Sequence, residues 1–124
     1  MKTTSIQKLP VGSAGCGDIR LLSDGFDLLI QFEYGSGSNE QIGAVKFENV
    51  TRYEFCEENA CREFVPGSLN AVVEVNDSET LNEFATEKQS KHYYVLYLSG
   101  NGRIDVLAKS VMLLPPSNTW HIIN

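Results

Sequence analysis

Two titratable side chains interrupt apolar segments, where an enzyme could use them. His92 opens the segment HYYVLYL, and Glu74 stands among the valines of VVEVN. A histidine can act as a general base, and a carboxylate on the inner face of a sheet has a raised pKa, a common feature of functional sites. A histidine at a strand end and a solvated glutamate are the ordinary alternatives, and they stay open. On the chemical interpretation, His92 and Glu74 belong to a pocket on the concave face of a sheet, in a small hydrolase or a small-molecule-binding protein.

No stronger catalytic signature accompanies them. The segment GSAGCG lacks the Lys-Ser/Thr of a phosphate-binding loop, and no serine or cysteine stands in a nucleophile elbow. Cys16, Cys56 and Cys61 are an odd count, and the four residues between Cys56 and Cys61 fit neither a C-x-x-C redox motif nor a zinc ribbon. We therefore expect free thiols in a reducing compartment, with no metal site and no cofactor.

Acidic residues gather in one quarter of the chain. Residues 33–63 contain seven glutamates and three basic residues, a net charge of −4 out of the −6 of the whole chain. Four of these glutamates flank a long irregular segment: Glu54, Glu57, Glu58 and Glu63. They are the candidate surface for a basic protein partner, such as a nuclease toxin whose active site attracts phosphate. A solvated face that keeps the protein soluble is the alternative.

Length and composition exclude several classes of protein. A chain of 124 residues can bury an independent core, so we expect one domain over residues 18–124, preceded by a flexible arm over residues 1–17. The net charge of −6 argues against nucleic-acid binding by phosphate neutralisation. The sequence has no apolar run of the roughly 18 residues that span a membrane and no signal-peptide pattern, so we expect a cytoplasmic protein.

Alternating apolar and polar residues predict a mainly antiparallel sheet. Two hairpins are expected, over residues 91–109 around the turn SGNG and over residues 18–34 around Asp24-Gly25. In the first, one face of residues 103–109 is expected to be largely exposed to solvent. In the second, one face is expected to form a wall of the core, with Phe26, Leu28, Ile30, Phe32 and Tyr34. Further strands are expected over residues 42–47, 50–58 and 69–75. Asn76-Asp77-Ser78 offers N-cap residues for one short helix over about residues 78–89. The fold class expected is α+β, a curved sheet or open barrel of about seven or eight strands with one helix across it.

The end of the chain is apolar. The run SVMLL is expected to stop at Pro115-Pro116, and Trp120, Ile122 and Ile123 follow. Such a tail either docks on the body of the protein or forms a homodimer contact with a second copy.

A resemblance covers the C-terminal half. The segment AVVEVNDSETLNEF followed by KHYYVLYLSGNGRIDVLAKSVMLLP resembles a group of small uncharacterised bacterial proteins, in which a valine-glutamate strand, a Ser-capped helix and a His-aromatic hairpin occur in this order. Some small acidic bacterial proteins of this build resemble immunity proteins, which sit on a toxin and neutralise it. The resemblance favours a binding role and assigns no residues. Because the sequence also lacks a nucleophile elbow, a phosphate-binding loop, a metal-ligand spacing and a cofactor fingerprint, we expect a non-enzymatic protein-binding module of the immunity type.

Overall fold

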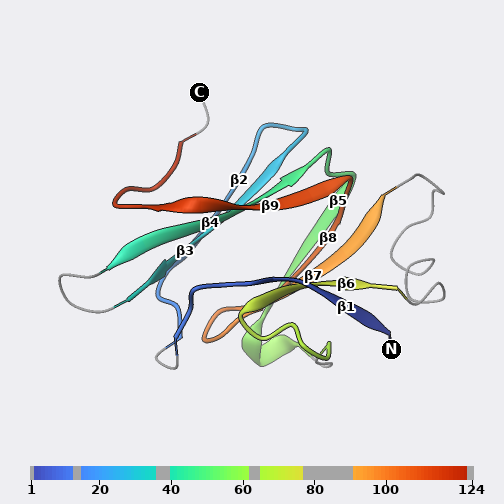
Figure 1. Ribbon diagram of the computed structural model, residues 1–124, viewed down its shortest axis with the longest axis horizontal. Helices are drawn as coiled ribbons and strands as arrows, with labels where there is room; N and C mark the ends of the chain where they lie inside the picture. The colour runs from blue at the N-terminus through green and yellow to red at the C-terminus, as the bar shows by residue number, and fades with distance from the viewer. Residues whose placement is uncertain (1, 13–14, 36–39, 62–64, 77–90, 123–124) are drawn as a thin grey trace.

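Nine strands form two antiparallel sheets in this computed structural model, which describes all residues except 1, 13–14, 36–39, 62–64, 77–90 and 123–124 (Figure 1). The five-stranded sheet has the order β1 (Thr3–Lys8), β6 (Ala71–Val75), β7 (His92–Leu98), β8 (Gly102–Ala108) and β5 (Arg52–Glu57). The four-stranded sheet has the order β2 (Ile19–Ser23), β3 (Leu28–Tyr34), β4 (Gln41–Glu48) and β9 (Ser110–Ser117). One 3-10 turn, η2 (Glu58–Ala60), follows β5.

The expected α+β class is wrong. The described part of the chain is nearly all β, in two open sheets rather than one curved sheet or barrel with a helix across it, and it contains no α-helix. The helix expected over residues 78–89 lies outside the described residues. Residues 1–17, expected to be an arm, include β1, in which Thr3 pairs with Val75 and Lys8 with Ala71 of β6. β1 and β9 join the sheets through pairing with the distant strands β6 and β4, which a local sequence pattern does not reveal.

Both expected hairpins are confirmed. β7 pairs with β8 from His92–Ala108 to Leu98–Gly102, and β2 pairs with β3 from Ile19–Phe32 to Ser23–Leu28. β7 lies in the middle of its sheet and is buried from Tyr93 to Leu96, as expected for a strand that is apolar on both faces.

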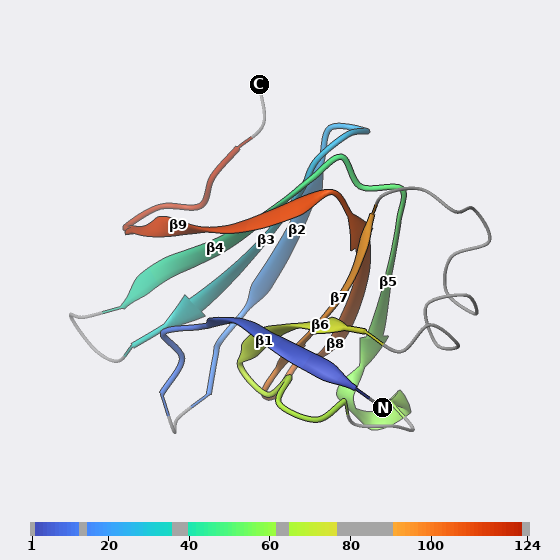
Figure 2. The ribbon, with the colours of Figure 1, turned by 45° about the vertical axis from the view of Figure 1, so that its right-hand side comes forward.

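Two connections that run side by side join the sheets at a corner. β4 continues into β5 and β8 continues into β9, so the chain leaves one sheet and enters the other twice, side by side (Figure 2). Asn49 adopts a φ of 51° at one bend. Backbone bonds hold the bends together, since Lys109 N donates to Glu48 O at 2.9 Å and Thr51 N donates to Leu107 O at 2.9 Å. Corners of this kind let two sheets pack at a large angle over one core.

The main core fills the space between the sheets. It consists of fully or almost fully buried apolar side chains: Leu9, Leu28, Ile30, Phe32, Val45, Phe47, Val72, Tyr94, Leu96, Leu98, Ile104, Val106 and Ala108. A second cluster lies on the other face of the five-stranded sheet and contains Val65, Val73, Val75, Tyr93, Val95 and Leu107. Each large side chain that is fully buried stabilises the fold by about 1.5–3 kcal/mol before entropy is counted.

Three local expectations fail for identifiable reasons. The supposedly wet face of β8 is buried, with Asp105 only 9% exposed, because its charges are paired as described below. β9 continues through Pro115 and Pro116; it is the last strand of its sheet, where a missing N–H can face outward. Phe26, expected in the core wall, lies in the turn before β3 and is 72% exposed.

Candidate functional site

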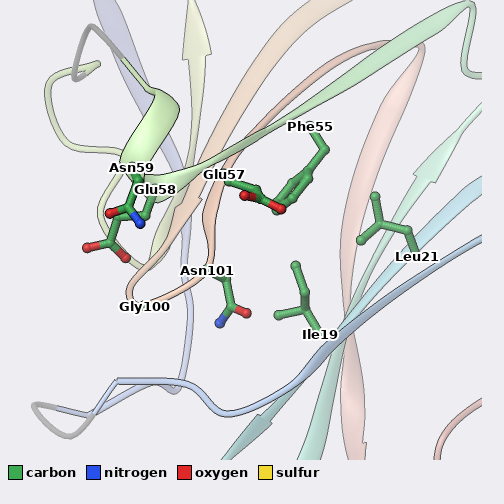
Figure 3. A pocket seen from close by; sticks show the side chains of 8 residues that line it. All are labelled: Ile19, Leu21, Phe55, Glu57, Glu58, Asn59, Gly100 and Asn101. Atoms are coloured by element: carbon green, nitrogen blue, oxygen red, sulfur yellow. The ribbon is translucent and has the colours of Figure 1, made fainter.

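A cleft separates the last strands of the two sheets. β2 and β5 are each the final strand of their sheet, and between them lies a space of about 790 Å³. Its walls come from both strands, from η2 and from the β7–β8 turn, and consist of Ile19, Leu21, Phe55, Glu57, Glu58, Asn59, Gly100 and Asn101. Figure 3 shows Phe55 and Glu57 on one side of the space, with Ile19 and Leu21 facing them across it.

Alternation along β5 decides which side chains reach the cleft. Successive residues of a strand point to opposite faces, so Phe55 and Glu57 share the cleft side while Glu54 and Cys56 take the other. Phe55 remains 42% exposed although it is large and apolar. The cleft thus offers an apolar wall next to a carboxylate.

Only part of the predicted acidic surface lies at this site. Glu57 and Glu58 line the cleft, whereas Glu54 accepts a hydrogen bond from Arg52 on the opposite face of β5. Glu63 lies outside the described residues. The single acidic face predicted from these glutamates is therefore divided, and two of its members share the cleft.

Asn101 closes one end of the cleft. Its side-chain N–H groups donate to Gly17 O at 2.9 Å and to Cys16 Sγ at 3.0 Å, which ties the segment before β2 to the β7–β8 turn. Its backbone oxygen accepts a bond of 3.1 Å from Glu58 N. These bonds fix the distance between the two walls at this end, so the cleft is preformed there.

Both strands that border the cleft have one edge with no partner strand in the described part of the chain. Because Glu58 N bonds Asn101 O within the antiparallel register of β5 and β8, the N–H and C=O groups of Tyr53 and Phe55 point away from β8. By the same logic, the 3.0 Å bond from Glu33 N to Asp18 O directs the backbone groups of Ile19 and Leu21 away from β3. An edge of this kind can pair with an added strand.

The predicted pair His92 and Glu74 does come together, at a different place. His92 Nδ1 lies 2.6 Å from Glu74 Oε2, although 18 positions separate the residues. Tyr94 lies beside them, with ring centroids 5.9 Å from His92, and burial together with the Glu74 charge raises the pKa of Tyr94. The His92 side chain is 48% exposed, and the cleft of Figure 3 is lined by other residues. The pair thus has the contact of a catalytic dyad and stands at the surface.

A buried charge network occupies the outer face of the five-stranded sheet, and the sequence did not reveal it. Arg103 bonds Asp105 twice, at 2.7 Å through Nε and at 2.8 Å through Nη2. Tyr93 donates its hydroxyl proton to Asp105 and accepts a 3.2 Å bond from Arg103. Burial, and then the Asp105 carboxylate, raises the pKa of Tyr93. The pairing of β7 with β8 would have been enough to predict this contact, because its register places Tyr93 diagonally opposite Asp105.

The structure also brings two cysteines together. The Cys61 thiol donates toward Cys56 O at 3.0 Å and toward Glu57 O at 3.1 Å. No signal in the spacing C-x₄-C pointed to this proximity, which arises because η2 reverses the chain after β5. Within the described ranges, no three His, Cys, Asp or Glu side chains gather in a way that could hold a metal ion.

Neither membrane criteria nor similarity adds a function. In the described part of the chain, no helix has the length and apolarity required to cross a membrane. Comparison with protein-family models, curated proteins and solved structures finds no match to this chain.

Proposed function

We propose that this protein is a protein-binding module whose cleft between β2 and β5 takes up an extended, basic segment of a partner. The observation that supports the proposal most is that the cleft is bordered by two strand edges, neither of which has a partner strand among the residues that the structure describes. Tyr53 and Phe55 in one wall direct their backbone donors and acceptors away from β8, and Ile19 and Leu21 in the other wall direct theirs away from β3. Main-chain bonds to an added strand give affinity without requiring a particular sequence.

The side chains that line the cleft indicate which segment would fit. Its apolar members, Ile19, Leu21 and Phe55, suit the apolar side chains of an extended peptide. The charged residues that line it are Glu57 and Glu58, and both are acidic. Because alternate side chains of a strand face opposite ways, a segment that alternates apolar with Lys or Arg residues satisfies both features. The net charge of −6 would also speed encounter with a basic partner.

An immunity-type role is one form of this proposal. A toxin that acts on nucleic acid needs a positively charged surface, and a module with an acidic cleft can cover such a surface. The area of the partner that touches Glu57 and Glu58 would then be the part that attracts phosphate in the free toxin.

A binding titration tests the proposal. The probe is a fluorescent synthetic peptide that alternates valine with lysine, compared with a peptide of equal length that alternates valine with glutamate. We expect the basic peptide to bind, to bind less tightly as salt rises, and to lose roughly tenfold or more in affinity to a variant with Glu57→Lys and Glu58→Lys. Exposed reversals should cost no more than about 0.5 kcal/mol of folding free energy each.

A matched variant separates the cleft from overall charge. Glu40→Lys with Glu48→Lys changes the net charge from −6 to −2, the same change that the cleft variant makes. This control should lose much less affinity for the basic peptide. Equal loss in the two double variants, or equal binding of the valine-glutamate peptide, would contradict a role for the cleft.

A second candidate function, a small hydrolase, is favoured by the 2.6 Å contact between His92 and Glu74. A carboxylate bonded to Nδ1 orients an imidazole so that Nε2 can act as a general base. Hydrolysis of an activated ester by the purified protein, compared with His92→Gln, tests this candidate. Equal rates for the two proteins would remove it.

A further inference from the structure

Cys56 and Cys61 are held in contact by the geometry of the chain after β5. Cys56 is the penultimate residue of that strand, and the 3-10 turn η2 follows Glu57. Cys61 N donates to Glu57 O at 3.1 Å, which closes the turn. Cys61 Sγ then lies 3.0 Å from Cys56 O and 3.1 Å from Glu57 O. The folded backbone therefore brings the second thiol back to the first.

The two thiols also interact with one another. The hydrogen bond between the Cys56 and Cys61 thiols raises the pKa of the Cys56 thiol, because it favours the protonated form of Cys56, and desolvation adds to this rise. Both cysteines are partly exposed rather than buried in the core, so a small reagent can reach them. Cys16 differs, because its sulfur bonds Ser99 O at 3.4 Å and Asn101 Nδ2 at 3.0 Å, on the other side of the β7–β8 turn.

We propose that Cys56 and Cys61 form a reversible disulfide by exchange with a small-molecule disulfide of the glutathione type. A thiolate of one cysteine attacks the small disulfide, forms a mixed disulfide and releases one small thiol. The second cysteine, once deprotonated, attacks the protein sulfur of the mixed disulfide and releases the second small thiol. Two protein thiols are oxidised, one small disulfide is reduced to two thiols, and the two protons lost by the cysteines end on those thiols.

The site would act on the wall of the cleft. The residues between the two cysteines include Glu57, Glu58 and Asn59, which line the cleft. A covalent link from Cys56 to Cys61 would hold these three residues in one closed loop. The exchange itself does not depend on what occupies the cleft, so it stands or fails separately from the proposed function.

Equilibration of the folded protein in mixtures of reduced and oxidised glutathione tests the proposal. After quenching and alkylation, we expect the mass to show one alkylated cysteine in place of three, and peptide mapping to place the label on Cys16 and the link between Cys56 and Cys61. A reducing agent should restore three labels. Exchange should quicken as pH rises toward the pKa of the thiols, since only the thiolate attacks.

Two comparisons make the result decisive. Cys16→Ser should form the same disulfide, while Cys61→Ser should stop at a mixed disulfide on Cys56. The reduced-to-oxidised glutathione ratio at the midpoint should indicate a disulfide roughly tenfold or more easier to form in the folded protein than in urea, because the fold holds the thiols together. Equal midpoints in the two states, three labels at every ratio, or stable glutathione adducts on both cysteines would overturn the proposal.

Discussion

The side-chain amide of Gln31 exchanges two hydrogen bonds with the backbone of His121, 90 positions further along the chain. Gln31 Nε2 donates to His121 O at 3.3 Å, and His121 N donates to Gln31 Oε1 at 2.5 Å. Gln31 is fully buried, a rare position for an amide side chain. Nearby, the Arg20 guanidinium lies 4.2 Å from the centre of the Trp120 ring. These contacts dock the tail on the outer face of the four-stranded sheet.

Substitution of Gln31 by leucine should release this tail. The change removes both bonds to His121, and leaving the backbone groups of His121 unpaired in place costs about 1–3 kcal/mol, so the tail should leave the sheet instead. The single tryptophan reports the release, because Trp120 emission should shift to the red. Ile122→Ala is the control, since Ile122 is 78% exposed, and it should leave emission unchanged. An unchanged spectrum in the Gln31 variant would show that other contacts hold the tail.

The predicted homodimer contact through Trp120, Ile122 and Ile123 stays a prediction. The docked position of Trp120 offers an alternative use for the tail, because this ring already contacts Arg20 of the same chain. Sedimentation of the full chain and of a chain without residues 117–124 separates the two. A full chain that is a dimer and a truncated chain that is a monomer support the dimer contact, whereas a monomer in both cases rejects it.

The Tyr93 network should make stability fall at alkaline pH. The folded-state pKa of Tyr93 is raised above its ordinary value of 10.0, so the folded protein binds this proton more tightly than the unfolded chain. The stability that this pKa shift of Tyr93 contributes is fully present below about pH 10 and is lost as pH rises through the folded-state pKa. Tyr93→Phe removes this group, and its free energy of unfolding should fall less between neutral and strongly alkaline pH. Parallel curves for the two proteins would contradict the assignment.

Gly43 should tolerate no side chain. A Cβ added there would lie 2.5 Å from the Phe32 ring, within the main core. Gly43→Ala should therefore destabilise the protein by about 1–3 kcal/mol, the usual cost of overpacking. At Gly12 an added Cβ meets nothing within 4 Å, which makes Gly12→Ala the matched control with little expected change. Urea unfolding measures both variants, and equal midpoints would show that the core adjusts around Phe32.

Local pattern was enough to predict the hairpins but not the sheets. Alternation and the turn residues around Gly25 and Gly100 specify which neighbouring segments pair, because these contacts are short in sequence. The division into two sheets depends on bends at Asn49 and Lys109, where a strand changes partners. Nothing in local periodicity distinguishes such a bend from the end of a strand.

The candidate site shows the same limit. Glu57 and Glu58 could be selected from charge density, whereas Ile19 and Leu21 join them only because β2 and β5 end their sheets. The face of β8 that we expected to be wet is buried because Arg103 and Asp105 pair with each other. A charged pair that satisfies itself looks, in sequence, like a solvated face.

Backbone hydrogen exchange with and without the valine-lysine peptide tests the central claim most directly. If the peptide adds a strand in the cleft, amides that point into it become bonded, and exchange slows at Tyr53 and Phe55 of β5 or at Ile19 and Leu21 of β2. The amides of Arg52 and Glu54 point toward β8 and serve as internal references with little change. Slowed exchange at β1 or β9, with the β2 and β5 edges unaffected at saturating peptide, would contradict the account.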